Sequence, residues 1–151
     1  MHKHNFKKRE EQLLIVFNRL GSLYYLSFTS QEIFHNKIIG LDGLRRKILI
    51  IEDCNHRYDF RFIDLCEVKA CKLKKIYGSV NGSDSPKNRL EKYLEAITLQ
   101  FDFKRENPPV ALEFYPNITN NIFNITELER KAKQWEVLVS KMLPCPQQKI
   151  A

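Results

Sequence analysis

The sequence predicts an α+β protein: an N-terminal helix, a mostly antiparallel sheet of five to seven strands rolled into a barrel or sandwich, and a C-terminal amphipathic helix. Apolar residues in the middle of the chain recur at every second position, as in half-buried strands. The connections between these segments are too short for helical crossovers, which favours antiparallel pairing. Both ends of the chain instead carry the three- and four-residue spacing of amphipathic helices. A twisted sheet with one apolar face must close on itself or be covered, and the last helix is available to cover it.

The N-terminal third of the chain predicts a helix and then a segment with two interpretations. Residues 6–20 are charged at first and apolar afterwards, which predicts a short helix that ends at Gly21. Residues 23–28 suit a strand, whereas residues 29–32 have the spacing of a capping box and suit a helical turn. We expect a strand followed by a turn. The two glycines around Asp42 then predict a second turn.

Two hairpins are predicted in the middle of the chain. The apolar run 48–51 and the alternating segment 58–63 predict the first hairpin. In residues 67–77 the apolar positions change parity near Ala70, which predicts a bulge or a bend. A polar stretch with two glycines, residues 78–89, follows and predicts a loop between strands.

The second hairpin is formed by the alternating segments 97–104 and 110–115, with Asn107-Pro108-Pro109 as its turn. The final helix is predicted to begin at Thr126, with Glu129 at capping-box spacing, and to end before Pro144. One apolar stripe runs along this helix and predicts that it packs on the sheet. The stripe consists of Leu128, Ala132, Trp135, Val139 and Met142.

Residues 43–143 resemble the pleckstrin-homology-like superfold, in which successive antiparallel strands precede an amphipathic helix with a central tryptophan, here Trp135. The resemblance implies seven strands, so residues 23–39 would supply those missing from the five that the pattern predicts, and the N-terminal helix would be an addition. The segments IIGLDGLRRKILIIED and ELERKAKQWEVLVSKML also resemble parts of an uncharacterised family of small bacterial proteins, which implies no chemistry. The expected organisation is an N-terminal helix (1–21), a single domain of this superfold (22–143) and a tail (144–151).

The composition is that of one ordinary soluble domain, with 43% hydrophobic and 28% charged residues. The formal net charge of +7 favours contact with phosphates or an anionic surface. No uncharged stretch reaches the ~20 residues of a membrane-spanning helix, and the apolar run 13–17 is too short for the core of a secretory signal peptide. The four cysteines have irregular spacings, which predicts reduced thiols in a cytoplasmic protein.

Catalytic and metal-binding motifs are weak in this sequence. A zinc site at Cys54, His56, Cys66 and Cys71 would need cysteines paired two to four residues apart, so buried free cysteines are the favoured interpretation. The lysines around Cys71 would lower the pKa of its thiol if it were a nucleophile, but a structural thiol is again favoured. No nucleophile elbow, acid pair or phosphate-binding glycine loop is found. We therefore expect no enzyme, no cofactor and no metal.

Basic residues provide the remaining signal, and we predict that they form one positive rim. If the sheet forms as expected, this rim flanks the loop at residues 78–89. In pleckstrin-homology-like domains that bind inositol phosphates, basic side chains around such a loop hold the head group, so the resemblance permits that role. The alternative is a solvated basic face without a ligand. The rim consists of Lys69, Lys72, Lys74, Lys75, Lys87, Arg89 and Lys92.

These observations predict a non-enzymatic interaction module. Its partner would be a protein, or an anionic membrane surface, bound at an exposed strand edge or at the basic rim. The alternative is a nucleic-acid-binding domain, in which the rim contacts phosphates and exposed aromatic residues such as Tyr77 or Tyr93 stack on bases. The apolar face of the N-terminal helix is expected to dock either on the rest of this chain or on a partner.

Overall fold

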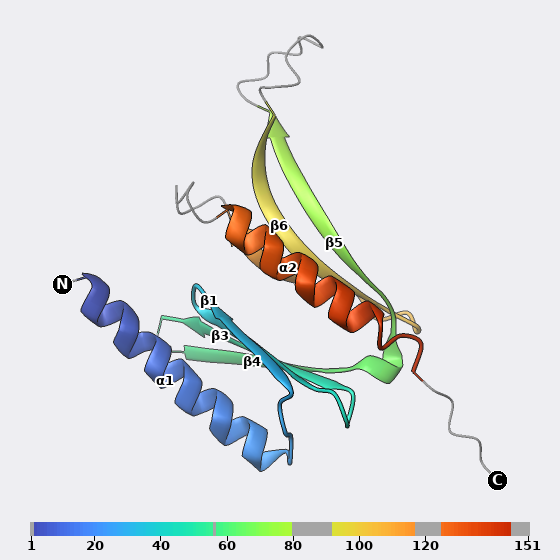
Figure 1. Ribbon diagram of the computed structural model, residues 1–151, viewed down its shortest axis with the longest axis horizontal. Coiled ribbons are helices and arrows are strands. Elements are labelled where there is room, and N and C mark those ends of the chain that lie inside the picture. Colours follow the sequence, from blue (N-terminus) through green and yellow to red (C-terminus); the bar gives the residue numbers. More distant parts are fainter. Residues whose placement is uncertain (1, 56, 80–91, 117–124, 146–151) are drawn as a thin grey trace. The chain divides into compact units, whose positions relative to one another are not determined.

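The computed structural model describes residues 2–55, 57–79, 92–116 and 125–145 (Figure 1). The chain divides into two compact units, Met1–Glu67 and Val68–Ala151. Each unit combines one helix with one antiparallel sheet. No helix within the described ranges is both long and apolar enough to cross a membrane.

The first unit is a helix followed by a four-stranded meander, in which each strand pairs antiparallel with the next. A single turn of 3-10 helix, η1, closes the unit. The elements are α1 (His2–Leu23), β1 (Ser30–Phe34), β2 (Lys37–Asp42), β3 (Lys47–Cys54), β4 (Arg57–Asp64) and η1 (Leu65–Glu67).

The second unit is a three-stranded antiparallel sheet in the order β5-β6-β7, with helix α2 packed against all three strands (Figure 1). The elements are β5 (Val68–Ser79), β6 (Lys92–Phe103), β7 (Val110–Pro116) and α2 (Ile125–Ser140). Buried residues of α2 are Leu128, Ala132, Trp135 and Val139. This confirms the predicted apolar stripe, although Met142 lies beyond the end of the helix.

The predicted α+β class, the antiparallel pairing and the two terminal helices are confirmed. Both hairpins form, and a register shift between Val68 and Ala70 lies where the change of parity predicted a bulge. The described residues contain seven strands, divided between a four-stranded and a three-stranded sheet, so the seven-strand count agrees with the expected range while the barrel or sandwich stays a prediction. The predicted loop at residues 78–89 lies almost entirely outside the described ranges.

The end of α1 differs from the prediction. The helix continues through Gly21 to Leu23, and residues 23–28 contain no strand. The N–H of Tyr25 donates to the Ser22 carbonyl at 3.2 Å and the N–H of Leu26 donates to the Gly21 carbonyl at 2.8 Å. These two bonds form a Schellman cap, with Tyr25 at φ 58° in the position that glycine usually occupies. Gly21 is therefore not the residue that stops the helix.

Close packing explains the glycine at position 21. A Cβ atom there would lie 2.6 Å from Cε2 of Phe28, so only glycine allows this ring to approach α1. The same ring stacks on Phe17, with ring centroids 4.3 Å apart. Gly40 of β2 lies beneath both rings, where a Cβ atom would overlap Phe17 and lie 2.7 Å from Cδ1 of Phe28. Two glycines thus make room for two phenylalanines between α1 and the sheet.

These rings extend the core of the first unit. Its buried cluster consists of Leu13, Phe17, Leu26, Ile38, Leu49 and Ile51. Because α1 packs across β2 and β3, its apolar face is docked within its own unit. This settles which of the two expected docking partners the N-terminal helix uses.

Replacing Gly40 with alanine should destabilise the first unit, because the added methyl group must displace two packed rings. We expect Gly40→Ala to lower the free energy of unfolding by about 1–3 kcal/mol, the usual cost of overpacking a core. Urea denaturation followed by far-UV circular dichroism would measure it. Gly43→Ala is the matched control, since its Cβ would lie 3.1 Å from the Thr29 hydroxyl. Equal losses in the two variants would contradict the packing role of Gly40.

Candidate functional site

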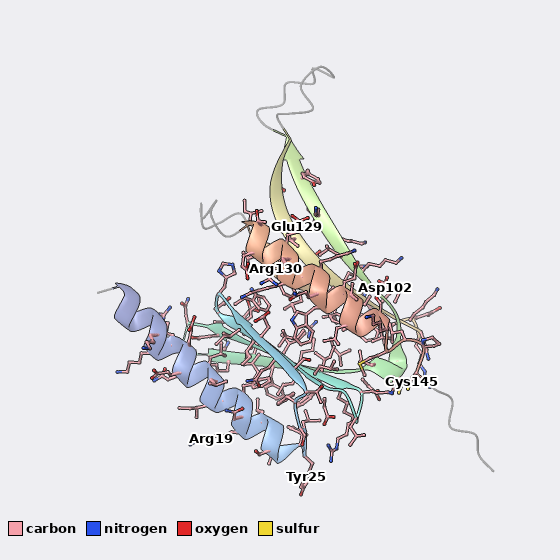
Figure 2. The ribbon with its side chains drawn as sticks, viewed as in Figure 1. Arg19, Tyr25, Asp102, Glu129, Arg130 and Cys145 are labelled. Carbon is pink, nitrogen blue, oxygen red and sulfur yellow. The ribbon has the colours of Figure 1, made fainter. Side chains whose placement is uncertain are left out.

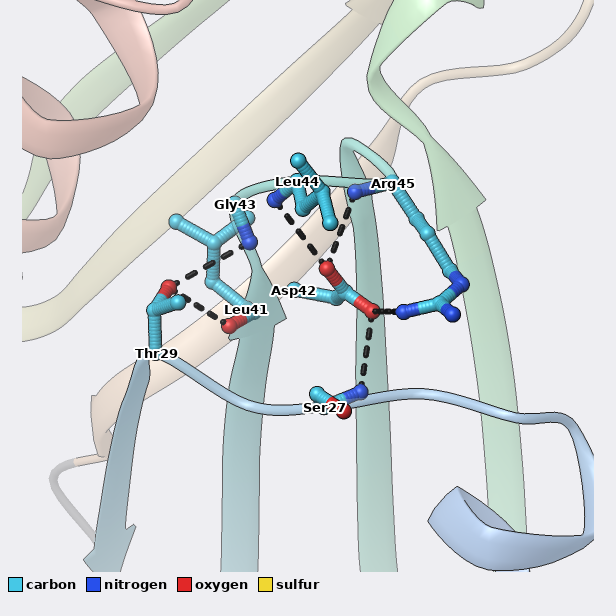
Figure 3. Close-up of polar contacts among 7 residues, drawn as sticks. All are labelled: Ser27, Thr29, Leu41, Asp42, Gly43, Leu44 and Arg45. Carbon is cyan, nitrogen blue, oxygen red and sulfur yellow. Dashed lines mark hydrogen bonds and ion pairs between the residues drawn. The ribbon is translucent and has the colours of Figure 1, made fainter.

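A buried carboxylate organises the turn between β2 and β3 (Figure 3). The side chain of Asp42 has no exposed surface. It accepts hydrogen bonds from the N–H groups of Leu44 at 3.1 Å, Arg45 at 2.9 Å and Ser27 at 2.9 Å. The Arg45 guanidinium adds an ion pair at 3.1 Å. Asp42 thereby ties the segment that follows α1 to the β2–β3 turn.

This arrangement makes Asp42 a structural residue rather than a catalytic one. Burial alone would raise the pKa of its carboxyl group, but the hydrogen bonds from Arg45 and Ser27 outweigh burial, and the pKa lies below its usual value of 3.8. The carboxylate is therefore charged near neutral pH. Its oxygens are already engaged with four donor groups, so it is not positioned to act as a general base.

Asp42→Asn should remove most of this stabilisation. The variant keeps the shape but loses the charge, and we expect the free energy of unfolding at pH 7 to fall by about 2–4 kcal/mol. Because the pKa of Asp42 is lower in the folded protein, its contribution is complete above the unfolded pKa and is lost as the pH falls through the folded pKa. Urea denaturation of the wild type and the variant between pH 7 and pH 2.5 should show the two stabilities converging at low pH. Glu11→Gln, an exposed carboxylate of α1, serves as the control; a pH-independent gap for Asp42→Asn would refute the proposed charge effect.

The predicted basic rim is divided by the register of β5. Lys75 faces α2 and forms an ion pair with Glu129 (Figure 2). The hydrogen bond within this pair raises the pKa of Lys75. Lys72 and Lys74 lie opposite Gln100 and Thr98 of β6, on the other face of the strand. Both side chains are exposed and form no ion pair with described residues. The structure therefore brings Lys72 and Lys74 together but separates them from Lys75.

The remaining rim residues are placed only in part. Lys69 is exposed and lies within the bulge at the start of β5. Lys92 begins β6 opposite Ser79, whereas Lys87 and Arg89 fall outside the described ranges. Tyr77 of β5 is exposed, as the nucleic-acid alternative requires.

The edge of β5 is protected by side chains of α2. The Leu73 N–H donates to the carboxylate of Glu136 at 2.5 Å, and the Ser140 hydroxyl donates to the Cys71 carbonyl at 3.5 Å. Partial burial would raise the pKa of Glu136, but the hydrogen bonds from Lys133 and Leu73 lower it further than burial raises it. A charged side chain thus satisfies a backbone group that an added strand would need. This stretch of β5 is not an available docking edge.

The structure differs from the prediction on the redox state of the cysteines and supports a structural role for Cys71. Cys66 and Cys145 are disulfide-bonded, so the prediction of four reduced thiols is wrong for these two residues. Cys54 and Cys71 are free. Burial, together with Glu136 and Asp102, raises the pKa of Cys71 to about 12, so the neighbouring lysines do not activate this thiol. No group of three or more metal-ligating side chains occurs in the part of the chain that the structure describes.

Counting thiols would test this assignment. Iodoacetamide added to the unfolded, unreduced protein should label two cysteines, Cys54 and Cys71, and prior reduction should raise the count to four. Mass spectrometry of the intact and digested protein gives both the number and the positions. Labelling of all four cysteines without reductant would show that Cys66 and Cys145 are reduced.

The edge of β4 contrasts with that of β5. Among the described residues, β4 pairs only with β3, so one side of the strand has no neighbouring strand. Arg57, Asp59 and Arg61 are exposed on one face. On the other face Phe60 is 51% exposed, which is unusual for a phenylalanine in a sheet. Arg57, Asp59 and Arg61 on one face and Phe60 on the other are thus accessible beside an edge with no described neighbour.

The hairpin register shows which backbone groups of β4 point outward. Cys54 pairs with Arg57 at one end of the β3–β4 ladder, and at the other end the Leu65 N–H donates to the Arg46 carbonyl at 2.9 Å. In an antiparallel ladder, hydrogen-bonded and non-hydrogen-bonded pairs alternate. Arg57, Asp59 and Arg61 therefore direct their backbone groups toward β3, whereas Tyr58, Phe60 and Phe62 direct theirs outward.

Aromatic rings from two elements gather beside this edge. Phe60 packs edge-on against Phe62, with ring centroids 5.8 Å apart. Tyr24, the residue that directly follows α1, is 48% exposed, and its ring centroid lies 4.4 Å from that of Phe62. The sequence predicted the β4 strand but not this exposed cluster, because alternation alone does not tell which apolar side chains remain uncovered.

Comparison with known proteins finds no matching family model, no similar curated protein and no similar solved structure. The function must therefore be argued from the geometry of the chain itself. The edge of β4, with the rings of Tyr24, Phe60 and Phe62 on one face and Arg57, Asp59 and Arg61 on the other, is the best-defined candidate site. We refer to it as the β4 edge site.

Proposed function

We propose that this protein is a non-enzymatic interaction module that binds an extended segment of a protein partner along the β4 edge site. The observation that carries the proposal is the exposure of Arg57, Asp59 and Arg61 on one face and of Phe60 on the other face of a strand that has no described neighbour on one side. An extended segment added to such an edge gains main-chain hydrogen bonds and contacts alternate side chains on each face.

The exposed backbone supports a strand rather than a helix as the occupant. The N–H and C=O groups of Tyr58, Phe60 and Phe62 point outward at a two-residue repeat, which is the repeat of a pairing strand. The exposed ring of Phe60 offers apolar area to be buried by alternate residues of that strand. Natural proteins usually protect such edges, as α2 protects β5 here. An edge whose outward backbone groups no described helix covers, and which carries an exposed phenylalanine, is therefore suited to binding.

We also propose that the chain adopts the pleckstrin-homology-like arrangement, with its strands forming a barrel or sandwich. Seven antiparallel strands followed by a helix with the buried Trp135 support this proposal, and residues 30–42 supply two of the strands that the resemblance required. The N-terminal helix α1 is an addition to that pattern. We also propose a cytoplasmic location. The sequence analysis based it on four reduced cysteines, and the disulfide bonding of Cys66 and Cys145 leaves two free thiols, Cys54 and Cys71, in its favour.

A nucleic acid is the second candidate partner, favoured by Lys69, Lys72 and Lys74. All three are exposed and form no ion pair with residues within the described ranges. Phosphate contacts at these lysines would weaken steeply as the salt concentration rises, whereas strand addition at an apolar edge would change little. An anionic membrane would share the salt dependence.

Selection from a phage-displayed library of random ten-residue peptides would test the proposed function. The wild type should enrich peptides that share a pattern, and Phe60→Pro should bind the enriched peptides about 10- to 100-fold more weakly. Proline removes both an outward N–H and the exposed ring, which together contribute roughly 1.4–2.8 kcal/mol to such a contact. Phe60→Ala keeps the N–H and should fall between the two.

A matched control uses the other outer strand of the same sheet. Gln31 of β1 is exposed, and the Phe34–Lys37 pair that closes its hairpin directs the Gln31 N–H away from β2. Gln31→Pro should bind the enriched peptides as the wild type does. Failure to enrich any peptide, or equal binding by Phe60→Pro, would overturn the proposal. Salt-dependent binding of a single-stranded oligonucleotide, lost in Lys72→Gln/Lys74→Gln but kept in Lys7→Gln/Lys8→Gln, would favour the nucleic-acid function instead.

A further inference from the structure

The β4 edge site carries a charge pattern that specifies its ligand more narrowly than the proposed function does. Arg57, Asp59 and Arg61 project from one face of the strand in the order basic, acidic, basic. In a paired strand, residues directly opposite each other lie on the same face with Cβ atoms about 5 Å apart. Each of these three side chains would therefore meet one side chain of the added strand.

The two arginines are available for such pairs. Arg57 and Arg61 form no ion pair with any described residue, and their neighbours on β3 are Cys54 and Ile50. Opposite charges directly across two strands stabilise the pairing, and like charges destabilise it. Acidic residues of the partner would therefore be favoured opposite both arginines.

The acidic residue between them favours a basic partner residue. Asp59 is exposed and lies opposite Glu52 of β3, so two carboxylates share this position of the sheet. The charge of Glu52 is balanced by an ion pair with Lys37 at 3.6 Å. Among the described residues, the only side chain that contacts the Asp59 carboxylate is the Cys54 thiol, a weak donor, at 3.6 Å. A cation on an added strand would therefore fit opposite Asp59.

The opposite face of β4 requires apolar residues at the intervening positions. Phe60 and Phe62 alternate with the charged residues along the strand, and Tyr24 extends the apolar surface from α1. An added strand would place every second side chain against these rings. Polar side chains at those positions would leave the Phe60 ring in water and gain little.

We infer that the β4 edge site selects an extended peptide in which apolar residues alternate with charged residues in the order acidic, basic, acidic. This inference rests on the proposed function, because it assigns a ligand class to the same site. The order reads identically in both chain directions, so it holds for parallel and for antiparallel addition. It also disfavours a polyanion as the ligand, because Asp59 interrupts the two cations.

The test compares three heptapeptides, each fused through a Gly/Ser linker to one soluble carrier protein. The matching peptide is Val-Glu-Val-Lys-Val-Glu-Val. The charge-reversed peptide is Val-Lys-Val-Glu-Val-Lys-Val, and Val-Glu-Val-Glu-Val-Lys-Val has the matching composition in another order. We expect the full-length wild type to bind the matching fusion about five- to tenfold more tightly than either other fusion, from three cross-strand charge pairs.

A charge-swap variant provides the decisive control. Arg57→Glu/Asp59→Lys/Arg61→Glu keeps all the rings and the backbone edge, and it should prefer the charge-reversed peptide. The preference of both proteins should shrink between 50 and 500 mM salt, because exposed ion pairs are screened. Circular dichroism of the swap variant would confirm that it folds.

The outcomes separate this inference from the proposed function. Equal binding of all three fusions, lost in Phe60→Pro, would overturn the charge pattern and leave strand addition standing. No binding of any fusion, together with no enrichment from the random library, would overturn both. Binding to vesicles that contain phosphatidylserine, abolished in the charge-swap variant without any preference among the peptides, would show that the arginines serve a membrane surface and would overturn the inference.

Discussion

The carboxylate of Asp42 is fully buried, remains charged, and accepts three backbone N–H groups and one guanidinium. Its hydrogen bond to Ser27 anchors the segment that leaves α1, and its bonds to Leu44 and Arg45 shape the turn from β2 into β3. The Thr29 hydroxyl reinforces this junction, because it accepts the Gly43 N–H and donates to the Leu41 carbonyl. This polar junction, together with the packed rings of Phe17 and Phe28, holds α1 on its sheet and thereby places Tyr24 beside β4.

The outer edges of strands β5 and β4 differ in how their backbone groups are covered. Along β5, Glu136 and Ser140 of α2 satisfy backbone groups at Leu73 and Cys71, so the helix covers part of the edge as well as one face of the sheet. Along β4, no described helix satisfies the outward backbone groups; exposed charged side chains lie on one face of the strand and the exposed Phe60 lies on the other. Charged residues discourage indiscriminate strand pairing, and they do so without preventing a partner of complementary charge. Protection and selectivity can thus reside in the same three residues.

The C-terminal cap of α1 places a non-glycine residue in an unfavourable backbone conformation. Tyr25 adopts φ 58° at the Schellman position and is 80% exposed, so its ring gains little from folding (Figure 2 labels Tyr25). Left-handed backbone is unfavourable for residues other than glycine by about 1–2 kcal/mol. Gly21, which the pattern suggested as the stop, is used for close packing against Phe28 instead. Gly21 therefore serves close packing with a phenylalanine ring, and Tyr25 rather than a glycine adopts the left-handed conformation that ends the helix.

The sequence by itself determined that a helix lies near each end of the chain, and it determined the two hairpins and the bulge near Ala70, because the two- and 3.6-residue periods of apolar residues are local properties of the chain. It also determined the buried stripe around Trp135. Only the tertiary structure decided that Lys75 turns toward Glu129 while Lys72 and Lys74 face away, that Glu136 reaches the backbone of Leu73, and that Phe60 stays uncovered. Those outcomes depend on which elements pack together and on which strand ends a sheet, and no periodicity within one segment carries that information.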